Sequence, residues 1–388
     1  MTVESALRGA PPHLLLDSLR VLLARRYAAS SADLLLVDYG LTCLRPVEPV
    51  QNPAGVRHEP VGAGHAGRVF RTQQPYLFRG DGPTGTAYLP VTVRGDRYGV
   101  LVVGLPAERT TPEAAGGLGA AAETLGHALH VADRHTDLYR STRGAAALGV
   151  AGGMQWDVLP GRACAAPEFD LHAHWEPAHA SGGHVLDWSV TEGRLQLVVG
   201  EGTGPGTPSA QVSTLALTAI RNARRAGLDL VGQASLTDQA LYGQYRGRAS
   251  LPALLLGFDL ATGRTEVVDA GSPTVWRTRG SATGRIALDR QLPLGMFEDS
   301  VYATQRLRVR PGDRLVFVAR GRAEPERAPG GPDEAADGPV ARAVALAARL
   351  NGADAPEAVV RALREQPRDV PGPVLVLCLD WRGRGVPE

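Results

Sequence analysis

The segment Gly200-Glu201-Gly202-Thr203-Gly204-Pro205-Gly206 decides how the second half of this chain is interpreted. It follows an apolar run, Arg194 to Val199, that is typical of a β-strand. A glycine-rich loop in this position can hold a phosphate, but the lysine and the following serine or threonine of a Walker motif are missing. The segment therefore does not match a Walker-type phosphate loop.

Two further short segments accompany this one. Gly182 to Asp187 reads GGHVLD and precedes it, whereas Ala319-Arg320-Gly321 follows much later. In order and spacing the three segments resemble the boxes GGDxxD, GDGxGHG and TDG of SpoIIE/RsbU-type PPM (PP2C-like) serine/threonine phosphatases. Five other segments carry the same resemblance: Met154 to Pro160, Asp259 to Gly263, Asp269 to Pro273, Leu292 to Gly295 and Pro311 to Leu315.

The resemblance implies an α+β fold for residues 154–388, a β-sandwich flanked by helices. It also implies a site for two divalent cations, about 3.5 to 4 Å apart, that activate water for attack on a phosphoester. Magnesium or manganese at such a site needs hard oxygen ligands. The three metal-binding aspartates of the family correspond here to His184, Glu201 and Arg320.

Each replacement weakens the expected metal site in its own way. His184 is a softer, neutral ligand, although the second acid of its box survives as Asp187. Glu201 keeps the charge but moves its carboxylate by about 1.5 Å, against a tolerance near 0.5 Å. Gly202 keeps the glycine of the box, and Pro205 replaces its histidine. Asp187 and Glu201 are the remaining candidates for metal ligands.

Arg320 has the largest effect because it places a permanent cation where metal ions should bind. At about 4 Å and an effective dielectric constant near 20, its repulsion of a divalent ion is about 8 kcal/mol. One hypothesis is that its guanidinium occupies the vacated metal position and pairs with Glu201 or Asp187. The alternative is a shifted alignment in which Arg320 points to solvent. The family's last acidic pair falls on residues 370–372, and only Asp369 lies nearby.

The first part of the chain differs from this pattern. A helix is expected from Pro12 to Tyr27, a strand from Ala32 to Tyr39, and a hairpin from Ala87 to Leu105 around Arg94-Gly95-Asp96-Arg97. A helix from Pro112 to Tyr139 is expected to close the unit. The phrases GRVFRTQQPYLF and LPVTVRGDRYGVLVVGLP resemble a GAF sensory domain, which implies a regulatory unit over residues 1–138 that can dimerise. Residues 139–153 are expected to form a helical connector.

Composition narrows the choice of partners and compartment. The 388 residues carry a formal net charge of +1, which favours neither nucleic acid nor an anionic membrane. No apolar stretch approaches the 18 or so residues of a membrane span. Three widely spaced cysteines fit a cytoplasmic protein without a disulfide framework.

Three functions remain open from the sequence. The favoured one is a pseudophosphatase that binds no metal cofactor and acts by binding proteins, as the resemblance implies for bacterial partner switching. Its partners would be STAS-domain anti-sigma-factor antagonists or anti-sigma factors, and Arg320 and Arg322 could hold a phosphate group or be surface charges. The second is an active phosphatase with an atypical ligand set that uses manganese or magnesium, and histidine ligation would also admit iron or zinc. The third is a GAF-based small-molecule sensor.

Overall fold

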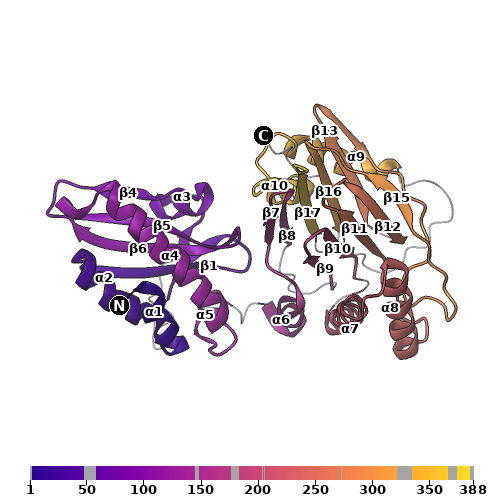
Figure 1. Ribbon diagram of the computed structural model, residues 1–388, viewed down its shortest axis with the longest axis horizontal. Helices are drawn as coiled ribbons and strands as arrows, with labels where there is room; N and C mark the ends of the chain where they lie inside the picture. Colours follow the sequence, from indigo (N-terminus) through magenta and orange to yellow (C-terminus); the bar gives the residue numbers. More distant parts are fainter. Residues whose placement is uncertain are drawn as a thin grey trace. The chain divides into compact units, whose positions relative to one another are not determined.

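The computed structural model describes residues 2–47, 58–144, 148–175, 183–202, 204, 206–271, 273–320, 334–365 and 374–384. The chain divides into two compact units, Met1–Ala147 and Leu148–Glu388. Helices and antiparallel strands alternate in both, which confirms the mixed fold predicted from the sequence. Each unit is described by itself below (Figure 1).

The first unit is built on one six-stranded antiparallel sheet with the strand order β3-β2-β1-β6-β5-β4. Leucines and alanines of β1, β5 and β6 pack with α1, α2 and α4 on one face of the sheet. A smaller cluster around Val69 and Phe70 attaches α3 to the other face. The elements are α1 (Val3–Gly9), η1 (Pro12–Leu14), α2 (Leu15–Tyr27), β1 (Ser31–Val37), β2 (Cys43–Pro46), β3 (Glu59–Pro60), α3 (Gly64–Thr72), β4 (Tyr76–Arg79), β5 (Thr84–Val93), β6 (Asp96–Pro106), η3 (Ala107–Arg109), α4 (Pro112–Ala132) and α5 (Leu138–Thr142).

The hairpin of β5 and β6 agrees with the prediction from the sequence. Its two-residue turn places Arg94 at φ 49° and Gly95 at φ 89°, the left-handed pair that matches the twist of the adjoining strands. The closing helix, in contrast, is shorter than expected. It ends at Ala132, and α5 begins again at Leu138 after a turn. This break lets Tyr139 be buried and donate its hydroxyl to the carbonyl of Pro12 at 2.7 Å.

The second unit is a β-sandwich. A five-stranded sheet, β15-β12-β11-β10-β9, faces a six-stranded sheet, β14-β13-β16-β17-β8-β7, and both are antiparallel throughout. Their inner faces share one core that contains Phe169, Phe258 and Phe317. The strands are β7 (Ala163–Ala166), β8 (Phe169–Trp175), β9 (Val185–Val190), β10 (Arg194–Gly200), β11 (Ala253–Asp259), β12 (Arg264–Ala270), β13 (Thr274–Arg279), β14 (Ala282–Arg285), β15 (Gln305–Arg308), β16 (Asp313–Arg320) and β17 (Val374–Trp381).

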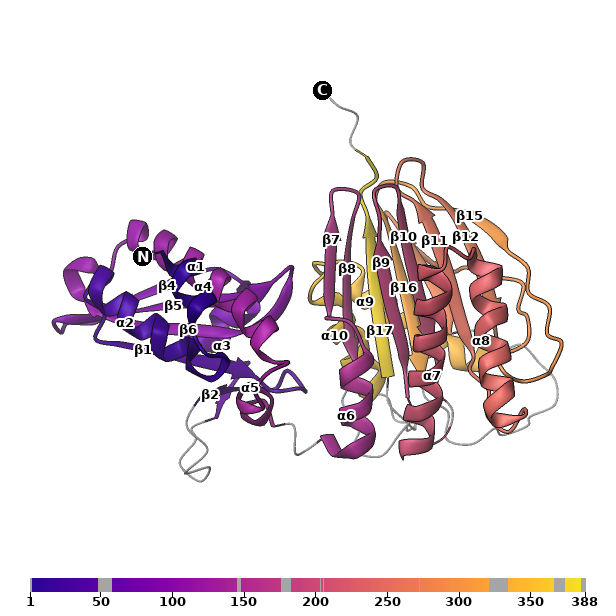
Figure 2. The same cartoon turned by 60° about the horizontal axis from the view of Figure 1, so that its bottom comes forward.

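Helices cover the sandwich on both sides, as the sequence predicts (Figures 1 and 2). α7 and α8 lie against the five-stranded sheet, and α6 packs beside α7. On the six-stranded sheet, α9 and α10 bury Val340, Val344, Val359 and Val360 against β16 and β17. The sequence did not predict α8 or α10. The helices are α6 (Gly149–Val158), α7 (Gly206–Arg225), α8 (Leu230–Tyr245), α9 (Glu334–Ala347) and α10 (Ala355–Arg364).

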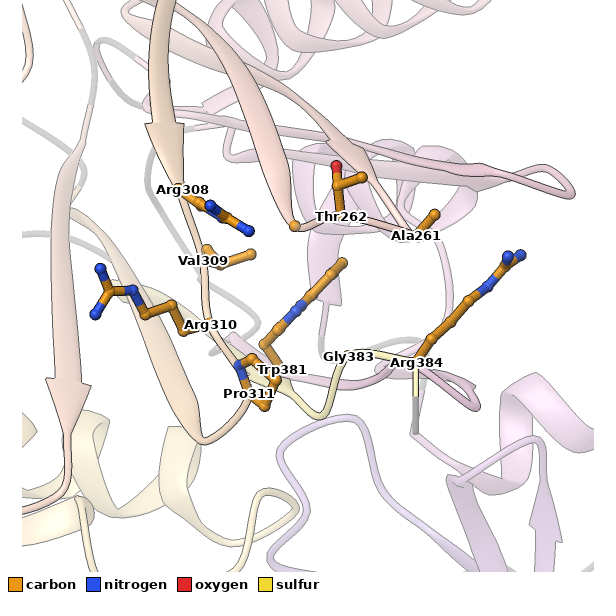
Figure 3. Close-up of a pocket in the computed structure, with 10 residues that line it drawn as sticks. Ala261, Thr262, Arg308, Val309, Arg310, Pro311, Trp381, Gly383 and Arg384 are labelled. Atoms are coloured by element: carbon orange, nitrogen blue, oxygen red, sulfur yellow. The ribbon is translucent and has the colours of Figure 1, made fainter. Parts of the chain in front are cut away.

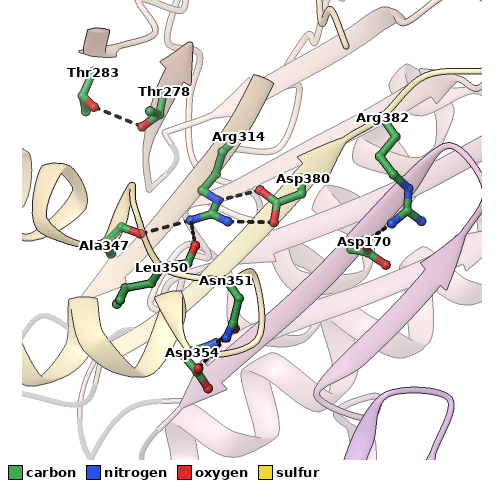
Figure 4. Close-up of polar contacts among 10 residues, drawn as sticks. All are labelled: Asp170, Thr278, Thr283, Arg314, Ala347, Leu350, Asn351, Asp354, Asp380 and Arg382. Carbon is green, nitrogen blue, oxygen red and sulfur yellow. Dashed lines mark hydrogen bonds and ion pairs between the residues drawn. The ribbon is translucent and has the colours of Figure 1, made fainter. Parts of the chain in front are cut away.

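One arginine fastens the end of α9 to the sheet. Arg314 of β16 donates to both carboxylate oxygens of Asp380 on β17, at 2.5 and 2.9 Å (Figure 4). The same guanidinium donates to the carbonyls of Ala347 and Leu350 at 3.0 and 2.9 Å. It therefore adds donors to carbonyls at and just beyond the C-terminal end of α9. No described helix is long and apolar enough to cross a membrane.

A buried histidine is expected to make the stability of the second unit depend on pH. His174 of β8 is 7% exposed, and burial, reinforced by Arg162, lowers its pKa from 6.5 to about 3. The unfolded chain binds a proton below about pH 6.5, whereas the folded chain does not. The contribution is therefore complete above that pH and is lost as the pH falls towards 3, by about 3 kcal/mol at pH 4.

His174→Leu is therefore expected to reduce the fall in the free energy of unfolding between pH 7 and pH 4. Chemical denaturation followed by circular dichroism between pH 4 and pH 7 measures this, and substitution of the exposed His127 by leucine serves as the control. An unaltered slope in His174→Leu would show that the histidine is protonated in the folded state.

Candidate functional site

The glycines of the first two boxes allow two loops to touch. A Cβ atom on Gly202 would lie 1.9 Å from the carbonyl oxygen of Gly183, which rules out any side chain at this position without a backbone shift. Gly183 is held in turn by α7, because its N–H donates to Ser209 Oγ and its carbonyl accepts from Ser213 Oγ, both at 2.7 Å. The box that leads into β9 and the box that follows β10 are therefore one structural unit.

Glu201 connects this unit to the third box. Its Oε1 accepts a hydrogen bond from the main-chain N–H of Arg320 at 3.1 Å. Glu201 follows β10 of one sheet and Arg320 ends β16 of the other. The three boxes that the sequence predicts to be neighbours thus meet at one end of the sandwich.

The contact between Glu201 and Arg320 differs from the hypothesis based on the sequence. The main-chain N–H of Arg320 binds the carboxylate, and no ion pair between its guanidinium and Glu201 or Asp187 occurs among the described residues. A carboxylate that accepts a main-chain N–H has one fewer direction for a metal ion. Any residue at position 320 except proline can supply this bond.

Asp187 lies away from Glu201. It pairs with Val198 in the register of β9 and β10, whereas Val185 pairs with Gly200. It is therefore two residues further along the strand than the turn, about 7 Å, and beyond the reach of Glu201. The side chain is 4% exposed and lies under α7.

Two arginines of α7 occupy the Asp187 carboxylate. Arg221 donates to Oδ1 through Nε at 3.1 Å and Nη2 at 2.8 Å, and Arg224 donates to Oδ2 through Nη2 at 2.7 Å. Arg221 Nη2 also donates to the carbonyl of Val158 at the end of α6, at 2.7 Å. Both oxygens of the aspartate are consequently committed to charged donors, which form the stronger class of hydrogen bonds.

His184 is buried at the junction with α6. It is 1% exposed, and its carbonyl accepts a hydrogen bond from Gln155 Nε2 at 3.2 Å. The imidazole is enclosed by protein. Two other predicted site residues, Arg322 and Asp369, lie outside the described residues, as do Thr203 and Pro205 of the second box.

The described residues do not fit a pair of divalent metal ions. No group of three or more His, Cys, Asp or Glu side chains with metal-binding geometry occurs within them. Asp187 is neutralised by two guanidiniums, each of which would repel a divalent ion about 4 Å away by about 8 kcal/mol. Glu201 is the one carboxylate at the meeting point of the three boxes in this part of the chain, and two metal ions need several.

Sequence reasoning missed the arginines that bind Asp187. A signal was present, because Arg221 and Arg224 are three positions apart, a spacing that places both on one face of a helix. What the sequence lacked was the packing of that face against β9. Gln155, Ser209 and Ser213 were also missed, since their roles depend on main-chain contacts.

A sandwich of two antiparallel sheets flanked by helices, with three glycine-containing boxes at one end, defines a domain of the PPM (PP2C-like) phosphatase class. The family model for stage II sporulation protein E (SpoIIE) matches residues 191–380. The C-terminal unit is therefore a SpoIIE-type domain. No curated protein matches the chain.

Solved structures from three bacteria are similar to the chain. The RsbU and RsbW domains of Rv1364c from Mycobacterium tuberculosis are 23% identical, with 57% of this chain and 62% of that chain covered and a TM-score of 0.48. The SiaA-PP2C domain of Pseudomonas aeruginosa is 20% identical, with 64% of this chain and 100% of that chain covered and a TM-score of 0.48. The PP2C phosphatase domain of SpoIIE from Bacillus subtilis, solved with a fragment of its regulatory domain, is 11% identical. The match covers 81% of this chain and 84% of that chain, with a TM-score of 0.45. The chain thus spans less than two thirds of the first of these proteins.

Proposed function

We propose that the C-terminal unit is a pseudophosphatase, a SpoIIE-type domain that binds proteins and does not hydrolyse phosphoesters. The observation that carries this proposal is the state of Asp187, whose two carboxylate oxygens are both bound by arginines of α7. The bond from the Arg320 N–H to Glu201 supports it further. The two acids that survive in the boxes thus have partners within the protein.

The resemblance to the SpoIIE family directs the search for partners. Proteins of bacterial partner-switching pathways are the proposed class, in particular STAS-domain anti-sigma-factor antagonists and anti-sigma factors. Such a regulator would bind its partner with the surface that its catalytic relatives use and leave any phosphate in place. Arg320, at the end of β16, supplies a cation where the boxes meet.

The N-terminal unit is proposed to be the regulatory part. Its antiparallel sheet, covered on both faces by helices, agrees with the GAF resemblance. An aromatic cluster lies beside α3, where the ring of His65 is 4.8 Å from that of Tyr76 and 5.2 Å from that of Phe78. Phe78 is 42% exposed, so the cluster offers a partly open aromatic surface.

Manganese titration and an activity assay test the proposal together. We expect calorimetry of the full chain to give no saturable manganese binding, and we expect no turnover of an aryl phosphate or a phosphorylated STAS-domain protein above the uncatalysed rate. An active SpoIIE-type phosphatase, assayed beside it, shows that the substrates are competent. Turnover that disappears in Asp187→Ala would establish the alternative, an active phosphatase with an atypical ligand set.

A further inference from the structure

We propose that a basic pocket at the other end of the sandwich binds a phosphate-type oxyanion. The boxes lie where β10 ends and β11 begins, since Gly200 pairs with Ala253. The pocket lies where β10 begins and β11 ends, at the level of the pair Arg194 and Asp259. Its volume is 330 Å³, and it is built from the turn between β11 and β12, the segment before β16 and the residues after β17.

The pocket has a strong excess of positive charge. Arg308, Arg310 and Arg384 line it, and none of its lining residues is acidic. In the described part of the chain, the guanidiniums of Arg308 and Arg310 form no ion pair. Arg384 forms one hydrogen bond to Glu168, at 3.2 Å, and its side chain is 57% exposed. An anion could therefore approach without displacing an internal carboxylate from Arg308.

A tryptophan provides the second, independent observation. Trp381 is 2% exposed and stacks on Phe258, with 5.9 Å between ring centroids. Its indole Nε1–H donates no hydrogen bond to the described residues. Nε1 itself is open to the space of the pocket and is not fully enclosed by protein. The indole N–H of a buried tryptophan usually has a hydrogen-bond partner, and a ligand in the pocket would supply that acceptor in place of water.

Two glycines keep the space around this N–H open. A Cβ atom would lie 3.4 Å from Trp381 Nε1 if added to Gly263 and 3.6 Å from it if added to Gly383. Both glycines line the pocket, and both have φ near 69°. Side chains at these positions would stand against the donor. The absence of these side chains leaves the space beside Nε1 unfilled, although the Cβ atoms would meet the Val309 carbonyl oxygen at 2.5 Å and Pro311 Cγ at 2.9 Å first.

The arrangement of donors indicates the chemistry of the ligand. Figure 3 shows Trp381 between Arg308 on one side and Arg384 on the other, whereas Arg310 extends away from them. A phosphate group accepts hydrogen bonds in several directions at once, so it suits donors that approach from different sides better than a planar carboxylate does. Arginine also binds phosphate oxygens in a forked geometry.

A second cavity extends the basic surface. It has a volume of 690 Å³, shares Arg308 with the first and adds Arg264 and Arg306. Its two acids are already engaged, because Glu266 binds Arg194 at 2.7 Å and Asp259 binds Thr262 at 2.8 Å. Arginines that line both cavities therefore contribute to the positive potential around Arg308.

Calorimetry of the full chain with inorganic phosphate, at an ionic strength held constant with chloride, tests the site. We expect saturable binding that weakens about tenfold in Arg308→Gln and about tenfold in Trp381→Phe, since each removes a charge-assisted hydrogen bond. Arg225→Gln, at an exposed position on α7, should leave the affinity unchanged. A parallel titration with O-phosphoserine distinguishes a phosphoester group, if it binds more tightly, from free phosphate, if it does not.

An NMR measurement keeps the test valid if Trp381→Phe does not fold. With ¹⁵N-labelled tryptophan, one indole N–H resonance of the unmodified protein should move when phosphate is added, and in Arg308→Gln it should move only at about tenfold higher concentration. No saturable binding, or equal binding by the unmodified protein and Arg308→Gln, would overturn the proposal. Neither measurement depends on phosphatase activity, so the result is separate from the proposed function.

Discussion

Replacing Asp187 by alanine is expected to lower the free energy of unfolding of the C-terminal unit by about 3 to 5 kcal/mol. The variant leaves Arg221 and Arg224 without their carboxylate, and their side chains are only 26% and 15% exposed. Removing one partner of a buried ion pair leaves uncompensated charge, which costs more than the pair itself contributes. Urea denaturation followed by circular dichroism measures the change.

A matched control separates burial from charge. Arg194 and Glu266 form an ion pair on the same sheet, but their side chains are 41% and 44% exposed. Glu266→Ala is expected to cost less than about 1 kcal/mol. If Asp187→Ala costs no more than Glu266→Ala, the arginines of α7 do not depend on Asp187, and the main support for the pseudophosphatase proposal is lost. Addition of manganese should leave the difference unchanged.

Gly202→Ala is expected to destabilise the C-terminal unit by at least about 3 kcal/mol. The new Cβ atom would lie 1.9 Å from the Gly183 carbonyl oxygen and 2.4 Å from its carbon. Main-chain atoms cannot rotate away as a side chain can, so the two loops must separate. The contacts of Gly183 with Ser209 and Ser213 would be disturbed at the same time. Thermal and urea unfolding both report the loss.

The control is a glycine with free space around it. Gly243 lies on the exposed side of α8, and a Cβ atom there would meet nothing within 4 Å. Gly243→Ala should stabilise the unit by about 0.5 to 1 kcal/mol, because alanine has the higher helix propensity. Equal effects of the two substitutions would contradict the close approach of the boxes.

The sequence predicted the framework of the C-terminal unit well. The apolar run Arg194 to Val199 and the glycines after it located β10 and the turn at Gly200 to Gly206. These features depend on local patterns, namely glycines at turns and apolar residues in strands. The helices α8 and α10 were missed although each carries a buried face. The break after Ala132 in α4 was also missed, and Tyr139 beyond it bonds to the distant Pro12.

For the site, the sequence did not predict the directions in which side chains and main-chain groups point. The sequence placed Asp187 and Glu201 in one acidic cluster, because both belong to boxes that meet in the fold. The register of β9 and β10 places them apart, and Asp187 lies on the face of β9 that packs against α7. The contact between Glu201 and Arg320 was predicted as a pair of residues but not as a main-chain bond. Contacts of this kind depend on atoms that every residue carries, so residue type does not reveal them.

The hydrogen bonds from Arg221 and Arg224 to Asp187 also determine whether the neutralisation of this carboxylate depends on metal ions. A carboxylate that is balanced by a metal ion changes its state with the concentration of that ion in the cell. Asp187 is balanced by Arg221 and Arg224, which are part of the same chain and present in a fixed ratio to it. Its neutralisation is therefore complete as soon as the chain has folded and is independent of metal supply and of chelators.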